Sequence, residues 1–194
     1  GGHFVFVIAG FIMPRMIDRR LGQELLGVWD FAWSLVSYLG LVQIGVASSV
    51  NRYVARYRIT GDITALNGIV SSASLVMTIS GVLALGLTIA ASLLIPQLFG
   101  VQLGENVREA QWAVFFLGVS MAIGVASGTF NGILTGCHHW RLRNIIESGW
   151  HAASITGMII ALLIGKGLWI LSLVFLVGTV LACATRITFA YRVC

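Results

Sequence analysis

The sequence predicts an all-α, polytopic membrane protein with six transmembrane helices. Of its 194 residues 58% are hydrophobic and only 10% are charged, whereas about 25% of the residues in soluble domains are charged. No charged residue occurs between Asp62 and Glu105. Small residues also recur at every fourth position in two long apolar segments, a spacing that favours close packing of membrane helices.

Charges, glycines and prolines set the limits of the expected spans. Residues 1–16 form a short first span, below the roughly 20 residues that a crossing needs, so we expect the N-terminus to be cut inside or just before a first helix. A polar connection with Arg15, Asp18 and Glu24 follows. The later limits are set chiefly by Gly61, Pro96 and a tight turn at residues 165–167. The expected spans are 1–16, 28–51, 67–95, 110–136, 145–165 and 168–185.

These runs are too long for the strands of a membrane barrel, and they lack its alternating pattern. The positive-inside rule orients the helices. With a cytoplasmic N-terminus, seven basic residues fall in inner connections: Arg52, Arg56, Arg58, Arg141, Arg143, Arg186 and Arg192. Five fall in outer ones: Arg15, Arg19, Arg20, Arg108 and Lys166.

The fourth and fifth spans each carry a ladder of small residues. The first ladder is Gly124, Gly128, Gly132 and Gly136, and the second is Gly149, Ala153, Gly157, Ala161 and Gly165. Each glycine would cost roughly 1 kcal/mol against alanine in a soluble helix. We therefore expect both ladders to be helix-packing faces.

A polar stripe follows one face of the second span. Its members are Asp30, Ser34, Tyr38, Gly45, Ser48, Arg52 and Arg56, at steps of three, four or seven residues. Such a face in a membrane turns to a protein interior or a watery cavity. Asp30 and Arg52 are 22 residues apart, about 33 Å along a helix, so they cannot pair and mark opposite ends of the span. The alternative places both among the lipid headgroups.

A second polar row, His139, Arg143, Glu147 and His151, lies at the start of the fifth span. Because histidine titrates near neutral pH, Glu147 and His151 form a candidate proton-linked pair. The alternative is a row of salt bridges at the membrane surface.

No catalytic constellation, phosphate-binding glycine loop or cofactor motif is visible, so we expect neither an enzyme nor a cofactor. Cys137, Cys183 and Cys194 are odd in number and far apart, which indicates neither a disulfide framework nor a zinc site. The adjacent His138 and His139 have no second ligand cluster, so no metal site is expected. The net charge of +5 comes from basic residues scattered among apolar spans, which does not indicate nucleic-acid binding.

Several short motifs, in order, resemble the polysaccharide flippases. These are the Wzx-like members of the multidrug/oligosaccharidyl-lipid/polysaccharide exporter superfamily. The motifs are Pro14-Arg15, Leu21-Gly22-Gln-Glu24-Leu-Leu-Gly27-Val-Trp, Gly45-Val-Ala-Ser-Ser-Val-Asn-Arg52-Tyr-Val-Ala55, Gly61-Asp62 and Phe130-Asn-Gly-Ile-Leu-Thr-Gly136. The chain departs from the family at Gln23, where proline is frequent, and at residues 137–140.

The resemblance implies one lobe of a two-lobe transporter, the N-terminal six-helix lobe, in the cytoplasmic membrane. It also implies translocation of undecaprenyl-diphosphate-linked oligosaccharide for polysaccharide export, with membrane lipids and the polysaccharide polymerase machinery as further partners. Arg15 and Arg52 are then the expected diphosphate contacts, and Asn131 and Asp30 the expected sugar contacts. Arginine suits phosphate because its planar fork can bind two oxygens.

Three alternatives stay open. A multidrug or cation antiporter of the same superfamily needs an acidic residue deep in the cavity, for which Asp30 is the candidate. An integral-membrane acyl- or glycosyltransferase would use His138, His139 or His151. A membrane scaffold would need none of these residues.

Overall fold

The computed structural model describes the backbone of residues 2–193, and the side chains in that range apart from residues 2–9, 11, 35–36, 39–47, 58 and 193. Within this part the chain forms seven α-helices and one 3₁₀ turn, without a strand. The elements are α1 (Gly2–Leu21), α2 (Gln23–Thr60), α3 (Ile63–Leu103), η1 (Gly104–Asn106), α4 (Val107–Ala126), α5 (Gly128–Gly136), α6 (Trp140–Leu163) and α7 (Leu168–Val193). The all-helical fold class is confirmed.

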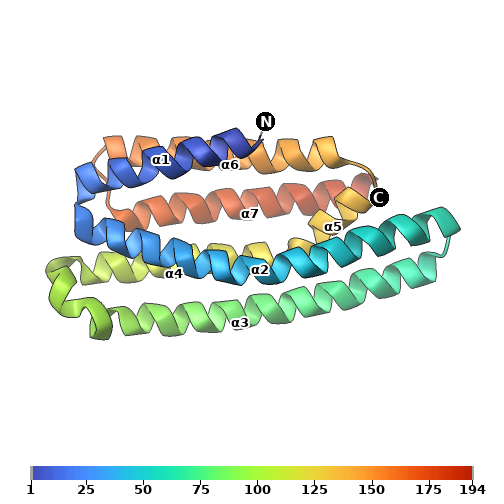
Figure 1. Ribbon diagram of the computed structural model, residues 1–194, viewed down its shortest axis with the longest axis horizontal. Coiled ribbons are helices and arrows are strands. Elements are labelled where there is room, and N and C mark those ends of the chain that lie inside the picture. The colour runs from blue at the N-terminus through green and yellow to red at the C-terminus, as the bar shows by residue number, and fades with distance from the viewer. Residues whose placement is uncertain (1, 194) are drawn as a thin grey trace.

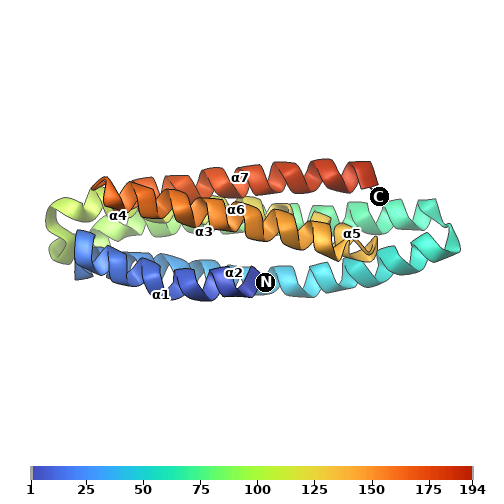
Figure 2. The ribbon, with the colours of Figure 1, turned by 90° about the horizontal axis from the view of Figure 1, so that it is seen from above.

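Apart from the short, oblique α5, the helices run along one long axis (Figure 1). The helices α1, α2, α4, α7 and α6 contact one another in that order, and α6 returns to α1, while α3 packs on the outside of α2 and α4. Figure 2 shows α6 between α7 and α1. We call the end with Gly22, η1 and Gly165 the Gly22 end, and the opposite end, with Gly61 and residues 137–139, the Gly61 end.

Glycines in the left-handed region make the sharpest reversals. Gly22 alone separates α1 from α2, with φ of 94°, a value that L side chains rarely adopt. Gly61 closes α2 with φ of 72°. Asp62 then caps α3, because its carboxylate accepts a hydrogen bond of 2.9 Å from the amide of Ala65.

Two helices continue past a proline at which the sequence indicated an end. The helix α1 runs through Pro14 to Leu21, so Arg15 and Asp18 lie on a helix and not in a polar connection. The helix α3 runs through Pro96 to Leu103. Proline in a helix interior costs about 3 kcal/mol, and the burial of Ile95 and Leu103 in the larger apolar cluster helps to offset this cost in α3.

Three stretches of the described chain are long and apolar enough to cross a membrane: Ile63–Gly136, Trp140–Leu163 and Leu168–Arg192. The first contains two antiparallel arms, α3 and then α4 with α5 (Figure 1). These lengths and compositions indicate a membrane protein.

The hairpin of α2 and α3 extends beyond the C-terminal end of α7 at the Gly61 end (Figures 1 and 2). The two helices have 38 and 41 residues, or about 57 and 62 Å at 1.5 Å per residue. A membrane is about 40–45 Å thick with its headgroups. The hairpin is therefore long enough to project from a bilayer.

Candidate functional site

A pocket lies between α1, α2, α6 and α7, nearer the Gly22 end than the Gly61 end. Its volume is ≈ 260 Å³, and its lining residues are Gly10, Met13, Pro14, Trp29, Asp30, Trp33, His151, Ile155, Met158 and Phe175. Asp30 and His151, which the sequence indicates as candidate site residues in two different polar rows, thus line one pocket. The structure brings together a carboxylate from α2 and an imidazole from α6.

Aromatic rings form much of the wall of this pocket. The ring centroids of Trp29 and Trp33 are 5.9 Å apart, and those of Trp33 and Phe175 are 5.2 Å apart, both edge to face. The His151 ring meets Phe175 edge to face at 6.3 Å. Such edge-to-face contacts hold the rings in defined positions. The pocket therefore combines a fixed aromatic surface with two hydrogen-bonding groups.

Asp30 lies in the first part of its helix. Because α2 begins at Gln23 and has 38 residues, Asp30 is about 10 Å from the start of a helix about 57 Å long. Phe175 lies equally far from Leu168, the first residue of α7. The pocket thus lies between four helices and nearer the Gly22 end, and Asp30 is an exposed residue at its edge.

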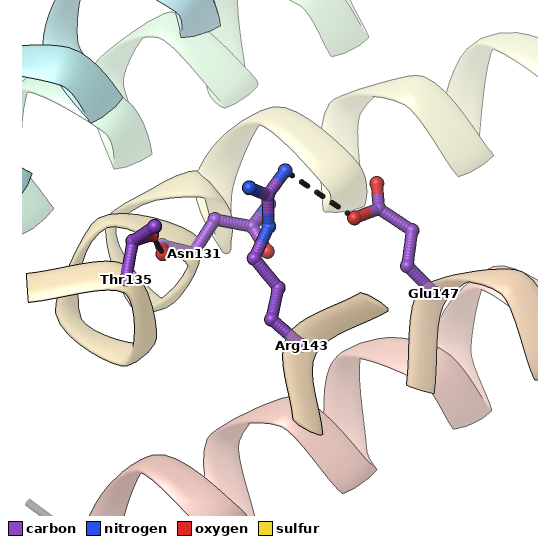
Figure 3. Close-up of polar contacts among 4 residues, drawn as sticks. All are labelled: Asn131, Thr135, Arg143 and Glu147. Atoms are coloured by element: carbon purple, nitrogen blue, oxygen red, sulfur yellow. Dashed lines mark hydrogen bonds and ion pairs between the residues drawn. The ribbon is translucent and has the colours of Figure 1, made fainter. Parts of the chain in front are cut away.

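A second polar group lies where α5 meets α6, near the Gly61 end. Arg143 pairs with Glu147 at 3.4 Å on the surface of α6. The side chain of Asn131 points toward Arg143 in Figure 3, and the Asn131 carbonyl accepts a hydrogen bond from the Thr135 hydroxyl. Asn131 Oδ1 and Arg143 Nε are both enclosed, and neither has a hydrogen-bond partner among the residues that the structure describes. Polar atoms of this kind need a partner such as water or a ligand.

The predicted diphosphate contacts, Arg15 and Arg52, line neither the Asp30 pocket nor the polar group at Asn131 and Arg143. Arg52 is exposed, with its guanidinium 5.3 Å from the ring centroid of Tyr53. Arg15 is exposed on α1, next to the pocket-lining Pro14. Arg52 follows Asp30 by about 33 Å along α2, so Arg15 and Asp30 lie towards the Gly22 end, whereas Arg52 and Asn131 lie towards the Gly61 end. Each end therefore holds one expected diphosphate contact and one expected sugar contact. Glu147 lies one turn from His151 and does not line the pocket.

Sequence reasoning missed one buried cation, Arg186, which it placed in a connection after the last span. The helix α7 continues past it, and Arg186 is only 8% exposed. On α7, Thr185 faces α6, since its hydroxyl accepts from Trp150 Nε1 at 2.8 Å, and Cys183 faces α4, with Sγ 3.0 Å from Ser127 Oγ. At 100° per residue, Arg186 lies between these two directions. It makes no ion pair or hydrogen bond with a described residue.

Metal chemistry finds no support among the residues that the structure describes, since no group of three His, Cys, Asp or Glu side chains lies close enough to hold an ion. His139 precedes α6 as its N-cap residue, and His138 has a positive φ of 63°. Cys137 is disulfide-bonded, contrary to the expectation from cysteine spacing. Cys183 is a free buried thiol, and Cys194 lies outside the described residues.

The fold and the pocket together define an α-helical membrane protein with a largely apolar pocket that carries one carboxylate and one imidazole. Neither a protein-family model, nor a curated protein, nor a solved structure matches this chain.

Proposed function

We propose that this chain is the N-terminal, six-span lobe of a transporter that flips lipid-linked oligosaccharide across the cytoplasmic membrane. The substrate in this proposal is a sugar unit on an undecaprenyl-diphosphate carrier. The observation that carries it is the pocket shared by Asp30, Trp29 and Trp33. A carboxylate accepts hydrogen bonds from sugar hydroxyls, and the C–H face of a sugar ring packs on aromatic rings, as other apolar groups do.

The cationic residues near the Gly61 end support an anionic carrier. The Arg186 side chain is largely buried, at 8% exposed, but none of its nitrogen atoms is among the fully enclosed atoms of the described residues that lack a hydrogen-bond partner. The guanidinium could therefore pair with a diphosphate that reaches this region. We therefore add Arg186 to Arg15 and Arg52 as proposed diphosphate contacts. The distance between Arg52 and Asp30, about 33 Å along α2, would place the two contacts at successive points of a transport path.

Antiport of a cation or proton is a second candidate function, and one observation favours it. Asp30 and His151 line the same pocket between α1, α2, α6 and α7. Ionisable groups inside membrane bundles commonly mark ion and proton paths. In this reading the aromatic wall would hold an organic cation through its ring faces.

Surface polysaccharide, measured in cells that lack the chromosomal copy, tests the pocket. Trp33→Ala should lower export at normal protein abundance because it removes the stacking surface, whereas Trp33→Phe should keep most of it. Asp30→Asn should retain part of the export, since the amide still bonds hydroxyls. Trp140→Ala, an exposed tryptophan outside the pocket, is the matched control. Normal export by both Trp33→Ala and Asp30→Ala would remove the pocket from the substrate path.

The same cells test the cationic contacts. Arg186→Gln and Arg52→Ala should each lower export, because losing one charge-assisted contact costs about 1.5–3 kcal/mol. Arg192→Gln, on the exposed surface of the same helix as Arg186, should not. Efflux of a cationic dye decides between the two functions. If Asp30→Asn abolishes efflux while surface polysaccharide stays normal, the antiporter proposal is supported and the flippase proposal is rejected.

A further inference from the structure

A second hollow lies at the Gly22 end, on the surface formed by η1, the first half of α4 and the first turn of α7. Its volume is ≈ 490 Å³, and it is lined by Glu105, Arg108, Glu109, Trp112, Phe116 and Trp169. It is separate from the Asp30 pocket and shares no residue with it. Nothing in the proposed transport path uses it.

One cation and one anion of this hollow are available to a ligand. Arg108 and Glu105 are both exposed, and neither makes an ion pair or hydrogen bond with a residue in the described ranges. Glu109 is a second carboxylate of the hollow, and only one of its oxygens, Oε1, accepts the amide of Leu168. The hollow therefore offers opposite charges on two side chains that do not neutralise each other.

Two half-exposed tryptophans complete the lining. Trp112 is 48% exposed and Trp169 is 41% exposed. Trp112 is held by Phe116, whose ring stacks on it at 5.5 Å. Tryptophan is enriched at the level of the lipid headgroups, and its ring face attracts ammonium groups.

Apolar surface continues from the hollow along α7. Val180 follows Trp169 by eleven residues, close to three turns, so both lie on one face of the helix. Val180 is exposed, as is the nearby Val177. A molecule with a charged head in the hollow could thus lay an acyl chain along this face.

We propose that the hollow binds the headgroup of a zwitterionic phospholipid. Arg108 takes the phosphate, and Glu105 with the rings of Trp112 and Trp169 takes the ammonium group. The neighbouring hollow at the same end, between α2 and α3, has Glu24 as its only charged lining residue, so it does not match a zwitterion. The inference is independent of the flippase proposal, since it involves neither the sugar nor its carrier.

Native mass spectrometry of the purified protein tests this site. The protein is placed in micelles that contain equal amounts of phosphatidylethanolamine and phosphatidylglycerol with identical acyl chains. We expect the retained lipid to be mainly phosphatidylethanolamine. Arg108→Gln should reduce that retention about fivefold, the order expected for one arginine at an anionic headgroup surface. Glu105→Gln should reduce the preference over phosphatidylglycerol, because it removes the partner of the ammonium group.

Lys166→Gln is the matched control, since Lys166 is an exposed cation at the same end that does not line the hollow. It should leave lipid retention unchanged. All three substitutions are at exposed positions, and a single folded species in size-exclusion chromatography shows that each variant is intact. Equal retention of the two lipids by the unaltered protein, or the same loss in Lys166→Gln as in Arg108→Gln, would overturn the proposal.

Discussion

At the scale of single residues, Glu109 links two turns of the chain at the Gly22 end. Its carboxylate accepts the backbone amide of Leu168, the first residue of α7. A carboxylate at a helix N-terminus is favoured by the helix dipole and satisfies one of the free amides there. Gly167 makes room for it, because a Cβ at that position would lie 2.7 Å from the carboxyl carbon of Glu109.

Gly167→Ala should therefore displace the Glu109 carboxylate and weaken the cap of α7. The expected loss is about 1 kcal/mol, as for other lost caps, which corresponds to a fall in Tm of about 2–4 °C for a chain of this size. Thermal unfolding of the purified protein in detergent measures it. Gly68→Ala is the control, because a Cβ there meets no atom within 4 Å and alanine favours helix. A Tm for Gly167→Ala at or above that of Gly68→Ala would contradict the prediction.

At the scale of helices, the glycine ladder of the fourth span is divided by a break. Ser127 separates α4 from α5, and its hydroxyl contacts Cys183 of α7. Gly124 remains on α4, while Gly136 ends α5 against α2. The ladder is thus not one continuous packing face. A close approach between α3 and α4 uses Gly118 instead, where a Cβ would collide with the side chain of Thr88.

Alanine at the two ends of this ladder should have opposite effects. A Cβ on Gly136 would lie 2.7 Å from Val54 Cγ1 and 3.1 Å from the carbonyl oxygen of Asn51. Overpacking of this kind costs about 1–3 kcal/mol. A Cβ on Gly124 meets nothing within 4 Å, so Gly124→Ala should be neutral or slightly stabilising. Detergent-solubilised yield and Tm of the two variants, measured together, should separate them, and equal values would show that α5 does not need glycine at its contact with α2.

At the scale of the whole molecule, the helix arrangement sorts the connections into two groups. Gly22, η1 and Gly165 lie at one end, and Gly61 with residues 137–139 lies at the other (Figure 1). The positive-inside prediction assigns the Gly61 end to the cytoplasm, because the connections there carry more arginine. The projecting hairpin of α2 and α3 would then stand in the cytoplasm.

Single-cysteine labelling in a background without the native cysteines tests this orientation. Thr60 is exposed near the tip of the hairpin, and Lys166 is exposed in the turn between α6 and α7. A membrane-impermeant maleimide added to intact cells should label Lys166→Cys and leave Thr60→Cys unlabelled. Permeabilised cells should label both. The reverse pattern in intact cells would invert the topology and place the Gly22 end in the cytoplasm.

The candidate site could be predicted only residue by residue. Asp30 and His151 stood out because polar, ionisable residues are rare in apolar helices. Their meeting in one pocket depends on the packing of α2 beside α1 and of α1 beside α6, which sequence spacing does not encode. Arg186 was placed in a connection for a related reason. A charged residue near the end of an apolar run marks either the end of the helix or a buried site. For Arg186 the packing of α7 against α4 and α6 decides between the two.

The sequence by itself determined the all-helical class and the membrane character, because composition and the length of uncharged runs depend on the chain alone. It also determined the turn at Gly61, where only backbone conformation matters. The tertiary structure decided the course of α1 and α3 through Pro14 and Pro96, since a local cost of about 3 kcal/mol can be outweighed by packing along the rest of the helix. It also decided the break at Ser127, the burial of Arg186 and the positions of the pockets. Each of these depends on contacts between helices that are distant in the sequence. The free energy of such contacts depends on residues from both helices, so it cannot be inferred from either segment alone.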